Sequence, residues 1–206
     1  MKIKFNKDFK IFKTGDEIAI RPNEVNYLVG LNGCGKSVIT SSLADHIYKS
    51  FTATKKKQQR HNWMTCPPDY IRENFSFEGF ESITDITFYT AKHRQSQFVD
   101  LDQTFDHPSS IACLRISEGM NNQSELVEAF KCRSDKNRLF IFDEIDGTLD
   151  IRAKCLFFDR LLPSLSGTAI VCSHETLLIR EKDVYDLSSN KQMKMVDYFT
   201  KHSTFV

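Results

Sequence analysis

The chain has 206 residues, and its 28 Lys and Arg residues are almost cancelled by 27 Asp and Glu residues, so the formal net charge is +1. This length predicts one domain, and a hydrophobic fraction of 40% is enough for an ordinary core. The near-neutral balance argues against a dedicated polybasic nucleic-acid binder, although not against a local basic patch. The apolar runs fall well short of the roughly 18 residues that a membrane span needs.

The N-terminal residues and the cysteines both indicate the cellular compartment of the protein. The first residues alternate lysines with apolar residues and lack the apolar core of a signal peptide. The six cysteines show neither a CxxC pair nor the spacing of a zinc site. Scattered thiols without a secretion signal are typical of a reducing compartment. We therefore expect a cytoplasmic protein with no membrane insertion.

The first part of the chain predicts short strands followed by one amphipathic helix. Alternating or apolar runs predict strands over Lys2–Asn6, Glu17–Ile20 and Val25–Val29, separated by turn residues. Over Lys36–Ser50, apolar residues recur at helical spacing without Gly or Pro. The basic stretch Thr54–Arg60 is typical of a solvated loop, and its alternative role is contact with a phosphate backbone.

The rest of the chain predicts strands that alternate with helices and a hairpin at the end. The predicted strands are Ile83–Tyr89, Arg138–Phe142 and Thr168–Cys172, and the predicted helices are Ser117–Lys131 and Ile151–Leu162. The hairpin is predicted from strands Asp183–Leu187 and Gln192–Val196. Strands that alternate with helices, with β pairs at both ends, predict an α/β fold with a largely parallel central sheet and an antiparallel flank.

The segment Gly30–Ser37 reads Gly-Leu-Asn-Gly-Cys-Gly-Lys-Ser and fits the GxxxxGK[ST] pattern of a P-loop, between an apolar strand and an amphipathic helix. Its glycines let backbone N–H groups turn toward a phosphate, and the N-terminus of the following helix favours the same anion. We expect Lys36 to reach the β- and γ-phosphates and Ser37 to ligate Mg²⁺. The residues predicted to bind the nucleotide here are Asn32, Gly33, Cys34, Gly35, Lys36 and Ser37.

Two further strand ends carry candidate chemistry. The apolar strand that ends in Asp143-Glu144 fits a Walker B motif. Asp143 is expected to bind Mg²⁺ through its water shell, and Glu144 to orient or deprotonate an attacking water. His174 follows the apolar run Ala169–Cys172. A histidine in that position is either a structural residue hydrogen-bonded to a loop or a functional one.

The order of these motifs resembles the ABC-type ATPase family, from Asn23 to Glu175. The P-loop is followed by a Ser-x-Gly signature at Ser117–Gly119, then by Asp143-Glu144, then by Leu149-Asp150, and then by His174. The resemblance implies a P-loop NTPase fold with a much reduced helical subdomain. It implies a single domain over residues 1–206, with short insertions at about 51–82 and 96–116.

The resemblance also implies roles for individual residues. Ser117 and Gly119 would contact the γ-phosphate of an ATP held by a second protomer, although Ser117 could instead be only a helix N-cap. Asp150 would belong to the D-loop that communicates between the two sites. His174 would hold the γ-phosphate and the attacking water. Two ATP molecules would then be buried in a head-to-tail homodimer.

Three positions depart from the pattern of the family. Glu118 places a negative charge within the signature, where the family has glycine. Gln95 is favoured over Gln97 as the Q-loop residue that would contact Mg²⁺ and the nucleotide. The adenine-stacking aromatic residue has no clear counterpart, although Phe9 and Phe12 lie in the corresponding region.

Only 21 residues lie between Gln95 and Ser117, which is too short for the helical subdomain of a transporter subunit or for an SMC-type coiled coil. We therefore expect a compact ATPase that binds Mg-ATP, dimerises on ATP and hydrolyses it to act on a macromolecular partner, as in DNA-maintenance, phage or defence proteins. The partner could be DNA, bound by Lys55–Lys57 and the N-terminal lysines, or a protein. The alternatives are an ATP-binding regulatory module with little hydrolysis, the ATP-binding subunit of a transporter, and a small-molecule kinase.

Overall fold

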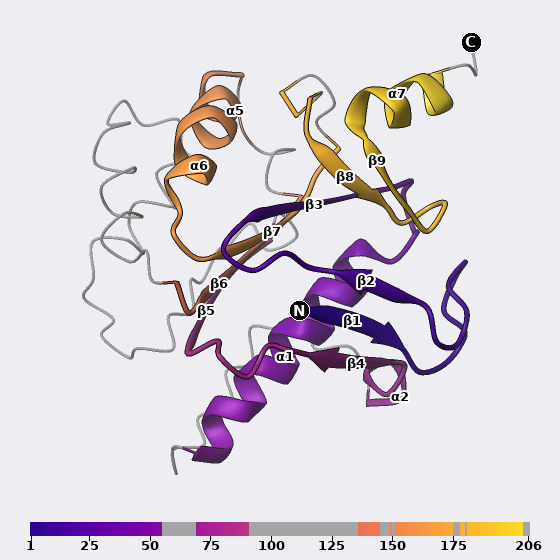
Figure 1. Cartoon of the computed structure of the whole chain (residues 1–206), viewed down its shortest axis with the longest axis vertical. Coiled ribbons are helices and arrows are strands. Elements are labelled where there is room, and N and C mark those ends of the chain that lie inside the picture. Colours follow the sequence, from indigo (N-terminus) through magenta and orange to yellow (C-terminus); the bar gives the residue numbers. More distant parts are fainter. Residues whose placement is uncertain are drawn as a thin grey trace.

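The chain folds into two β-sheets with helices packed around them (Figure 1). This computed structural model describes residues 1–54, 69–90, 136–144, 149, 151–174, 178–179 and 181–203. The larger sheet has six strands, of which all but the edge strand β9 are parallel, and the smaller sheet has three antiparallel strands. The predicted α/β class, with a largely parallel central sheet and an antiparallel flank, is confirmed.

The central sheet is built around strands that are buried on both faces. Its order is β5 (Asp85–Thr90), β6 (Arg138–Asp143), β7 (Thr168–Cys172), β3 (Val25–Val29), β8 (Asp183–Asp186) and β9 (Lys191–Lys194). Every residue of β7 is buried, as is all of β6 except Arg138. Such strands read as continuous apolar runs rather than as alternating ones, which is why the sequence predicted them.

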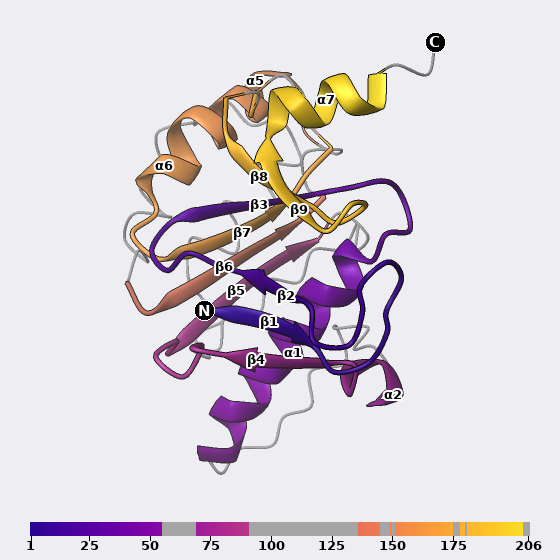
Figure 2. The ribbon, with the colours of Figure 1, turned by 45° about the vertical axis from the view of Figure 1, so that its right-hand side comes forward.

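The smaller sheet covers one side of the central sheet (Figure 2). Its middle strand β1 (Lys2–Phe5) pairs antiparallel with β2 (Glu17–Ala19) and with β4 (Phe75–Glu78), which follows the short helix α2 (Asp69–Arg72). The strand β1 was predicted from alternation, and β2 was predicted as a short strand between turn residues. The strand β4 was not predicted, although its residues alternate between apolar and polar, and it pairs with β1 along its whole length.

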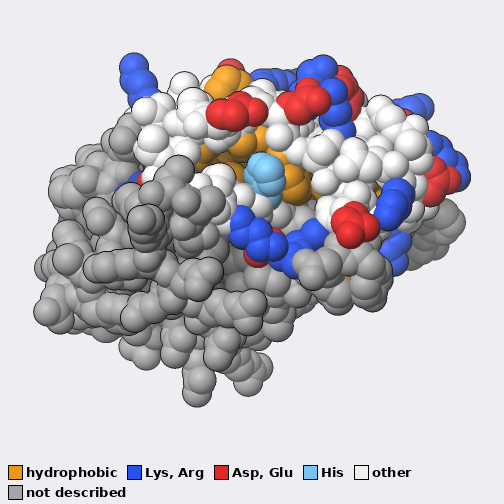
Figure 3. Space-filling model, turned by 90° about the horizontal axis from the view of Figure 1, so that it is seen from below, with side chains coloured by type: hydrophobic (Ala, Val, Ile, Leu, Met, Phe, Trp, Pro, Cys, Tyr) orange, Lys and Arg blue, Asp and Glu red, His pale blue; other side chains and the backbone are white. Residues whose placement is uncertain are grey.

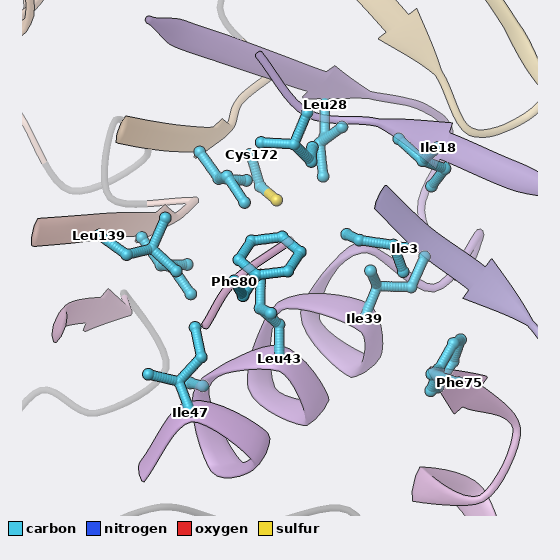
Figure 4. Close-up of a cluster of buried hydrophobic side chains, with 14 of the residues drawn as sticks. Ile3, Ile18, Leu28, Ile39, Leu43, Ile47, Phe75, Phe80, Leu139 and Cys172 are labelled. Carbon is cyan, nitrogen blue, oxygen red and sulfur yellow. The ribbon is translucent and has the colours of Figure 1, made fainter. Parts of the chain in front are cut away.

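Helix α1 (Lys36–Thr54) fills the space between the two sheets. Its fully buried residues Ile39, Leu43 and Ile47 belong to one apolar cluster with residues of both sheets (Figure 4). Leu28 and Leu139 contribute from the central sheet. The first residue of α1 is therefore held firmly against the carboxyl end of β3, where the P-loop lies.

The opposite face of the central sheet is covered by helices from the second half of the chain. These are α5 (Ile151–Leu156), a π-helical turn (Phe157–Leu161), α6 (Leu162–Ser164) and α7 (Met195–Ser203). Phe157 and Leu161 share a core cluster with Phe142 of β6, and Tyr198 of α7 belongs to the same cluster. The predicted helix Ile151–Leu162 is confirmed.

The predicted C-terminal hairpin is only partly correct. Strands β8 and β9 pair antiparallel, but β9 ends at Lys194, and α7 begins at Met195. The prediction of a strand through Val196 is wrong. Met195 and Tyr198 are both buried, so the apolar spacing from Met195 onward is helical rather than alternating. The described helices are all too short or too polar to cross a membrane.

Candidate functional site

The candidate site lies where three neighbouring parallel strands end. β7 lies between β3 and β6, and all three run in the same direction. In the strand register, Cys172 pairs with Leu28 on one side and with Asp143 on the other. The P-loop, Glu144 and His174 therefore leave the sheet at the same edge, which is where α/β sheets bind their ligands.

The P-loop folds around the ammonium group of its own lysine. Lys36 is only 3% exposed, and its Nζ donates a hydrogen bond to the Gly30 carbonyl at 2.9 Å. The Leu31 carbonyl lies 3.5 Å from the same atom. The backbone N–H of Cys34 donates to the Leu31 carbonyl at 3.2 Å, which closes the turn. A cation and a helix N-terminus thus face the same loop, and both favour an anion there.

Lys36, Glu144 and His174 meet at a single carboxylate oxygen. Glu144 Oε1 lies 3.5 Å from Lys36 Nζ and 3.3 Å from His174 Nε2. Lys36 is buried, whereas about a third of the Glu144 side chain and about half of the His174 side chain are exposed. Three residues that the sequence singled out on separate strand ends are therefore brought together. His174 contacts Glu144 beside the P-loop, and its functional role stays a prediction.

Asp143 and Ser37 supply the oxygen donors that Mg²⁺ would need. Asp143 is 2% exposed and is the last residue of β6, and Ser37 is half-buried in the first turn of α1. Mg²⁺ in nucleotide sites is held by one or two protein oxygens, phosphate oxygens and waters. One carboxylate and one hydroxyl at the same edge of the sheet fit that requirement. When bound, the ion would neutralise charge on the phosphates.

Cys172 lies between these elements but belongs to the core. Burial, followed by the negative charge of Asp143, raises the pKa of the Cys172 thiol well above its ordinary value. The thiol therefore stays protonated and packs with the apolar residues of the cluster between the two sheets.

Of the two phenylalanines considered for adenine stacking, only Phe9 lies beside the P-loop. A Cβ built on Gly35, whose φ is +111°, would lie 2.6 Å from Cε1 of Phe9. Phe12 is fully buried and stacks on Phe5, with ring centroids 4.0 Å apart. Phe12 is therefore a core residue, and Gly35 is required by the close approach of the Phe9 ring.

Several predicted site residues fall outside the described part of the chain. They are Gln95, its alternative Gln97, the signature residues Ser117 and Gly119 with Glu118 between them, and Asp150. The basic residues Lys55–Lys57 also lie outside it. These assignments remain predictions.

The N-terminal lysines are mostly compensated by carboxylates. Their ion pairs are Lys2–Glu17 at 2.7 Å, Lys4–Glu78 at 2.6 Å, Lys7–Glu73 at 3.3 Å and Lys13–Asp8 at 2.8 Å. On the face shown in Figure 3, basic side chains likewise lie beside acidic ones. These lysines therefore contribute less positive potential than their number suggests.

Glu144 adopts a strained backbone conformation. Its φ is +57°, in the left-handed region that favours glycine, and its N–H donates to the Cys172 carbonyl at 2.9 Å. A non-glycine residue in this region costs about 1 kcal/mol or more. This conformation accompanies the contacts that Glu144 makes with both Lys36 and His174. Strain of this kind is concentrated at functional sites.

We expect the variant Glu144→Gly to be more stable than Glu144→Ala by about 0.5–1 kcal/mol, because glycine tolerates the left-handed backbone. Both variants lose the same carboxylate, so the difference between their free energies of unfolding reports the cost of the left-handed backbone conformation. Urea unfolding of the two proteins measures it. Equal stability, or a more stable Ala variant, would show that the backbone of Glu144 is not strained.

Two residues near the P-loop were not singled out from the sequence. They are Asp186, at the end of β8, and Ser188, in the turn that follows. Only the hairpin that contains this turn was predicted. Nothing in the sequence signals that this turn would contact the P-loop, because the contact depends on β8 pairing beside β3.

The site as a whole combines a glycine-rich loop at a helix N-terminus, a buried cation, two adjacent carboxylates and an imidazole at the edge of a parallel sheet. Such a set can bind a polyphosphate with Mg²⁺ and activate a water beside it. No protein-family model matches this chain, and no curated protein matches it either.

Proposed function

We propose that this chain is an ATPase of the ABC type that binds Mg-ATP and hydrolyses it to ADP and phosphate. The observation that carries the proposal is the meeting of Lys36, Glu144 and His174 at the mouth of the P-loop, with Nζ and Nε2 each within 3.5 Å of one carboxylate oxygen. A cation for the phosphates and a carboxylate that can accept a proton from a water are the two groups that phosphoryl transfer to water requires side by side.

Each residue has a defined task in this proposal. The P-loop N–H groups and Lys36 bind the phosphates, and Ser37 and Asp143 hold Mg²⁺. Glu144 accepts a proton from the attacking water, and the hydroxide then displaces ADP from the γ-phosphorus. His174, hydrogen-bonded to Glu144, holds the γ-phosphate and the water in position.

The proposal extends to a homodimer and to a macromolecular partner. In the head-to-tail dimer, Ser117 and Gly119 complete the site of the other protomer, Gln95 contacts Mg²⁺ and the nucleotide, and Asp150 links the two sites. ATP binding and hydrolysis would then switch the dimer between states in the cytoplasm. The partner would be DNA or a protein, and DNA would be bound through Lys55–Lys57 rather than through the paired N-terminal lysines.

A regulatory module that binds ATP and hydrolyses it little is the second candidate. It is favoured by the altered signature, because Glu118 places a negative charge where the second protomer would contact the γ-phosphate. The two candidates share the same binding site and differ only in turnover.

Phosphate release by the purified full chain tests the proposal. We expect hydrolysis with ATP and Mg²⁺, and a fall to the background rate when EDTA removes the metal. Binding of a fluorescent ATP analogue is measured in the same samples. Nucleotide binding without turnover would favour the regulatory module, and the absence of both binding and turnover would refute the nucleotide site.

A further inference from the structure

The turn between β8 and β9 packs against the first glycine of the P-loop. A Cβ built on Gly30 would lie 3.0 Å from Ser188 Oγ and 3.3 Å from Leu187 Cβ. The backbone N–H of Leu187 donates to the Val29 carbonyl at 2.8 Å, as β8 continues beside β3. The turn and the start of the P-loop are therefore in direct contact, although they are far apart in the sequence.

One hydrogen bond from this turn fixes the segment that holds the P-loop lysine. The N–H of Leu31 donates to Ser188 Oγ at 2.7 Å. The Gly30 carbonyl, and at a longer distance that of Leu31, accept from Lys36 Nζ. Ser188 therefore restrains the Gly30–Leu31 segment through the Leu31 amide, while the carbonyls of the same segment accept hydrogen bonds from Lys36.

Ser188 is itself held by a buried carboxylate. Asp186 is fully buried, and its Oδ1 accepts the N–H of Ser188 at 2.8 Å. Its Oδ2 accepts from the Ser189 hydroxyl and from Lys201 Nζ at 3.2 Å. Burial alone would raise the pKa of Asp186, but these hydrogen bonds outweigh burial and hold the pKa below its ordinary value.

Helix α7 supplies the lysine that pairs with this carboxylate and a histidine beside it. Lys201 lies on α7, and His202 Nε2 on the same helix lies 3.8 Å from Asp186 Oδ2. A buried charge is tolerated only when it is paired and hydrogen-bonded, so α7 is needed to keep Asp186 in place. The chain of contacts runs from α7 through Asp186 and Ser188 to the P-loop.

We propose that Ser188, held by Asp186, is a positioning residue for nucleotide binding: it fixes the Gly30–Leu31 segment so that Lys36 is presented to the phosphates. This inference rests on the proposed function and deepens it. Ser188 acts through Leu31 and Lys36 and makes no contact with the reaction itself.

Ser189 provides a matched control, because it lies in the same turn and contacts the same carboxylate but makes no described contact with the P-loop. We expect Ser188→Ala to raise the KM for ATP about fivefold, the factor that corresponds to one ordinary hydrogen bond, with kcat changed less than about twofold. Ser189→Ala should leave KM unchanged. If Ser188 were merely structural, both variants would lower the Tm and neither would change KM.

Exchange of the Leu31 amide gives a readout that needs no nucleotide. In the Ser188→Ala protein we expect the Leu31 amide, followed by NMR, to exchange about fivefold faster than in the wild type and in Ser189→Ala. Unchanged exchange in Ser188→Ala, or an equal rise of KM in both variants, would overturn the inference. If exchange responds but the wild type binds no ATP, the proposed function fails while the hold of Ser188 on the loop stands.

Discussion

Replacing Lys36 with Met is expected to lower ATP hydrolysis by at least about 100-fold and to weaken ATP binding strongly. Lys36 Nζ is the buried cation of the P-loop, and no other lysine or arginine among the described residues has an ion pair with Glu144. Removal of one charged group that is aimed at developing negative charge costs about 3–4 kcal/mol in a preorganised site. Equilibrium binding of a fluorescent ATP analogue and phosphate release measure the two effects.

Lys36→Met should nevertheless fold. Met has a similar length and needs no desolvation of a charge, and this gain offsets the loss of the hydrogen bond to the Gly30 carbonyl. We therefore expect the free energy of unfolding to stay within about 1 kcal/mol of the wild-type value. A loss of ATP binding by a stable protein can then be assigned to the site rather than to the fold.

Lys49→Met is the matched control on the same helix. The side chain of Lys49 is 55% exposed, and its Nζ pairs with Asp45 at 2.9 Å, away from the P-loop. This variant should bind and hydrolyse ATP like the wild type. Wild-type ATP affinity in Lys36→Met, or an equal loss in both variants, would contradict the assignment of Gly30–Ser37 as a phosphate-binding loop.

The central part of the fold could be predicted from the sequence because local pattern and burial agree there. The strands β6 and β7 are apolar runs that are buried on both faces, the last three residues of β3 are buried too, and α1 carries Ile39, Leu43 and Ile47 at helical spacing. At the C-terminus the strand predicted from the local sequence pattern conflicts with the observed burial. The predicted strand ran through Val196, but Val196 is 40% exposed on α7, and the buried Met195 and Tyr198 determine the helix.

The members of the site could be predicted, but not their arrangement. The sequence singled out Lys36, Glu144 and His174 from motifs, yet motifs do not determine which strand lies beside which. The contacts at Glu144 Oε1 exist because β7 lies between β3 and β6. The role inferred for Ser188 depends in the same way on β8, which pairs with the other side of β3.

The left-handed backbone of Glu144 was also beyond sequence reasoning. The conformation arises where the chain leaves β6 and the Glu144 N–H bonds to the Cys172 carbonyl of β7. Only the pairing of those two strands supplies that acceptor. A position that favours glycine but carries glutamate is a local conflict of the kind that proteins retain at functional sites.

Glu144→Gln is expected to lower kcat about 10²- to 10⁴-fold while ATP still binds. Gln keeps the size of the side chain and can still hydrogen-bond to His174, but it cannot accept a proton from water. Phosphate release and binding of the fluorescent analogue separate the two effects. Glu24→Gln is the matched control, because Glu24 is exposed and precedes β3 at the opposite edge of the sheet. Turnover that survives in Glu144→Gln would remove Glu144 from the role of base.

The same variant also tests the proposed dimer, because a protein that binds ATP without hydrolysing it accumulates in the ATP-bound state. Size-exclusion chromatography of Glu144→Gln should show a dimer with Mg-ATP and a monomer without it. Lys36→Met should remain monomeric under both conditions, since it cannot hold the nucleotide. Glu144→Gln could instead stay monomeric in saturating Mg-ATP while ATP binding is demonstrated in the same sample. That result would mean that one chain alone forms the complete nucleotide site. The roles proposed for Ser117 and Gly119 across a dimer interface would then be wrong, whereas those of Lys36, Glu144 and His174 would stand.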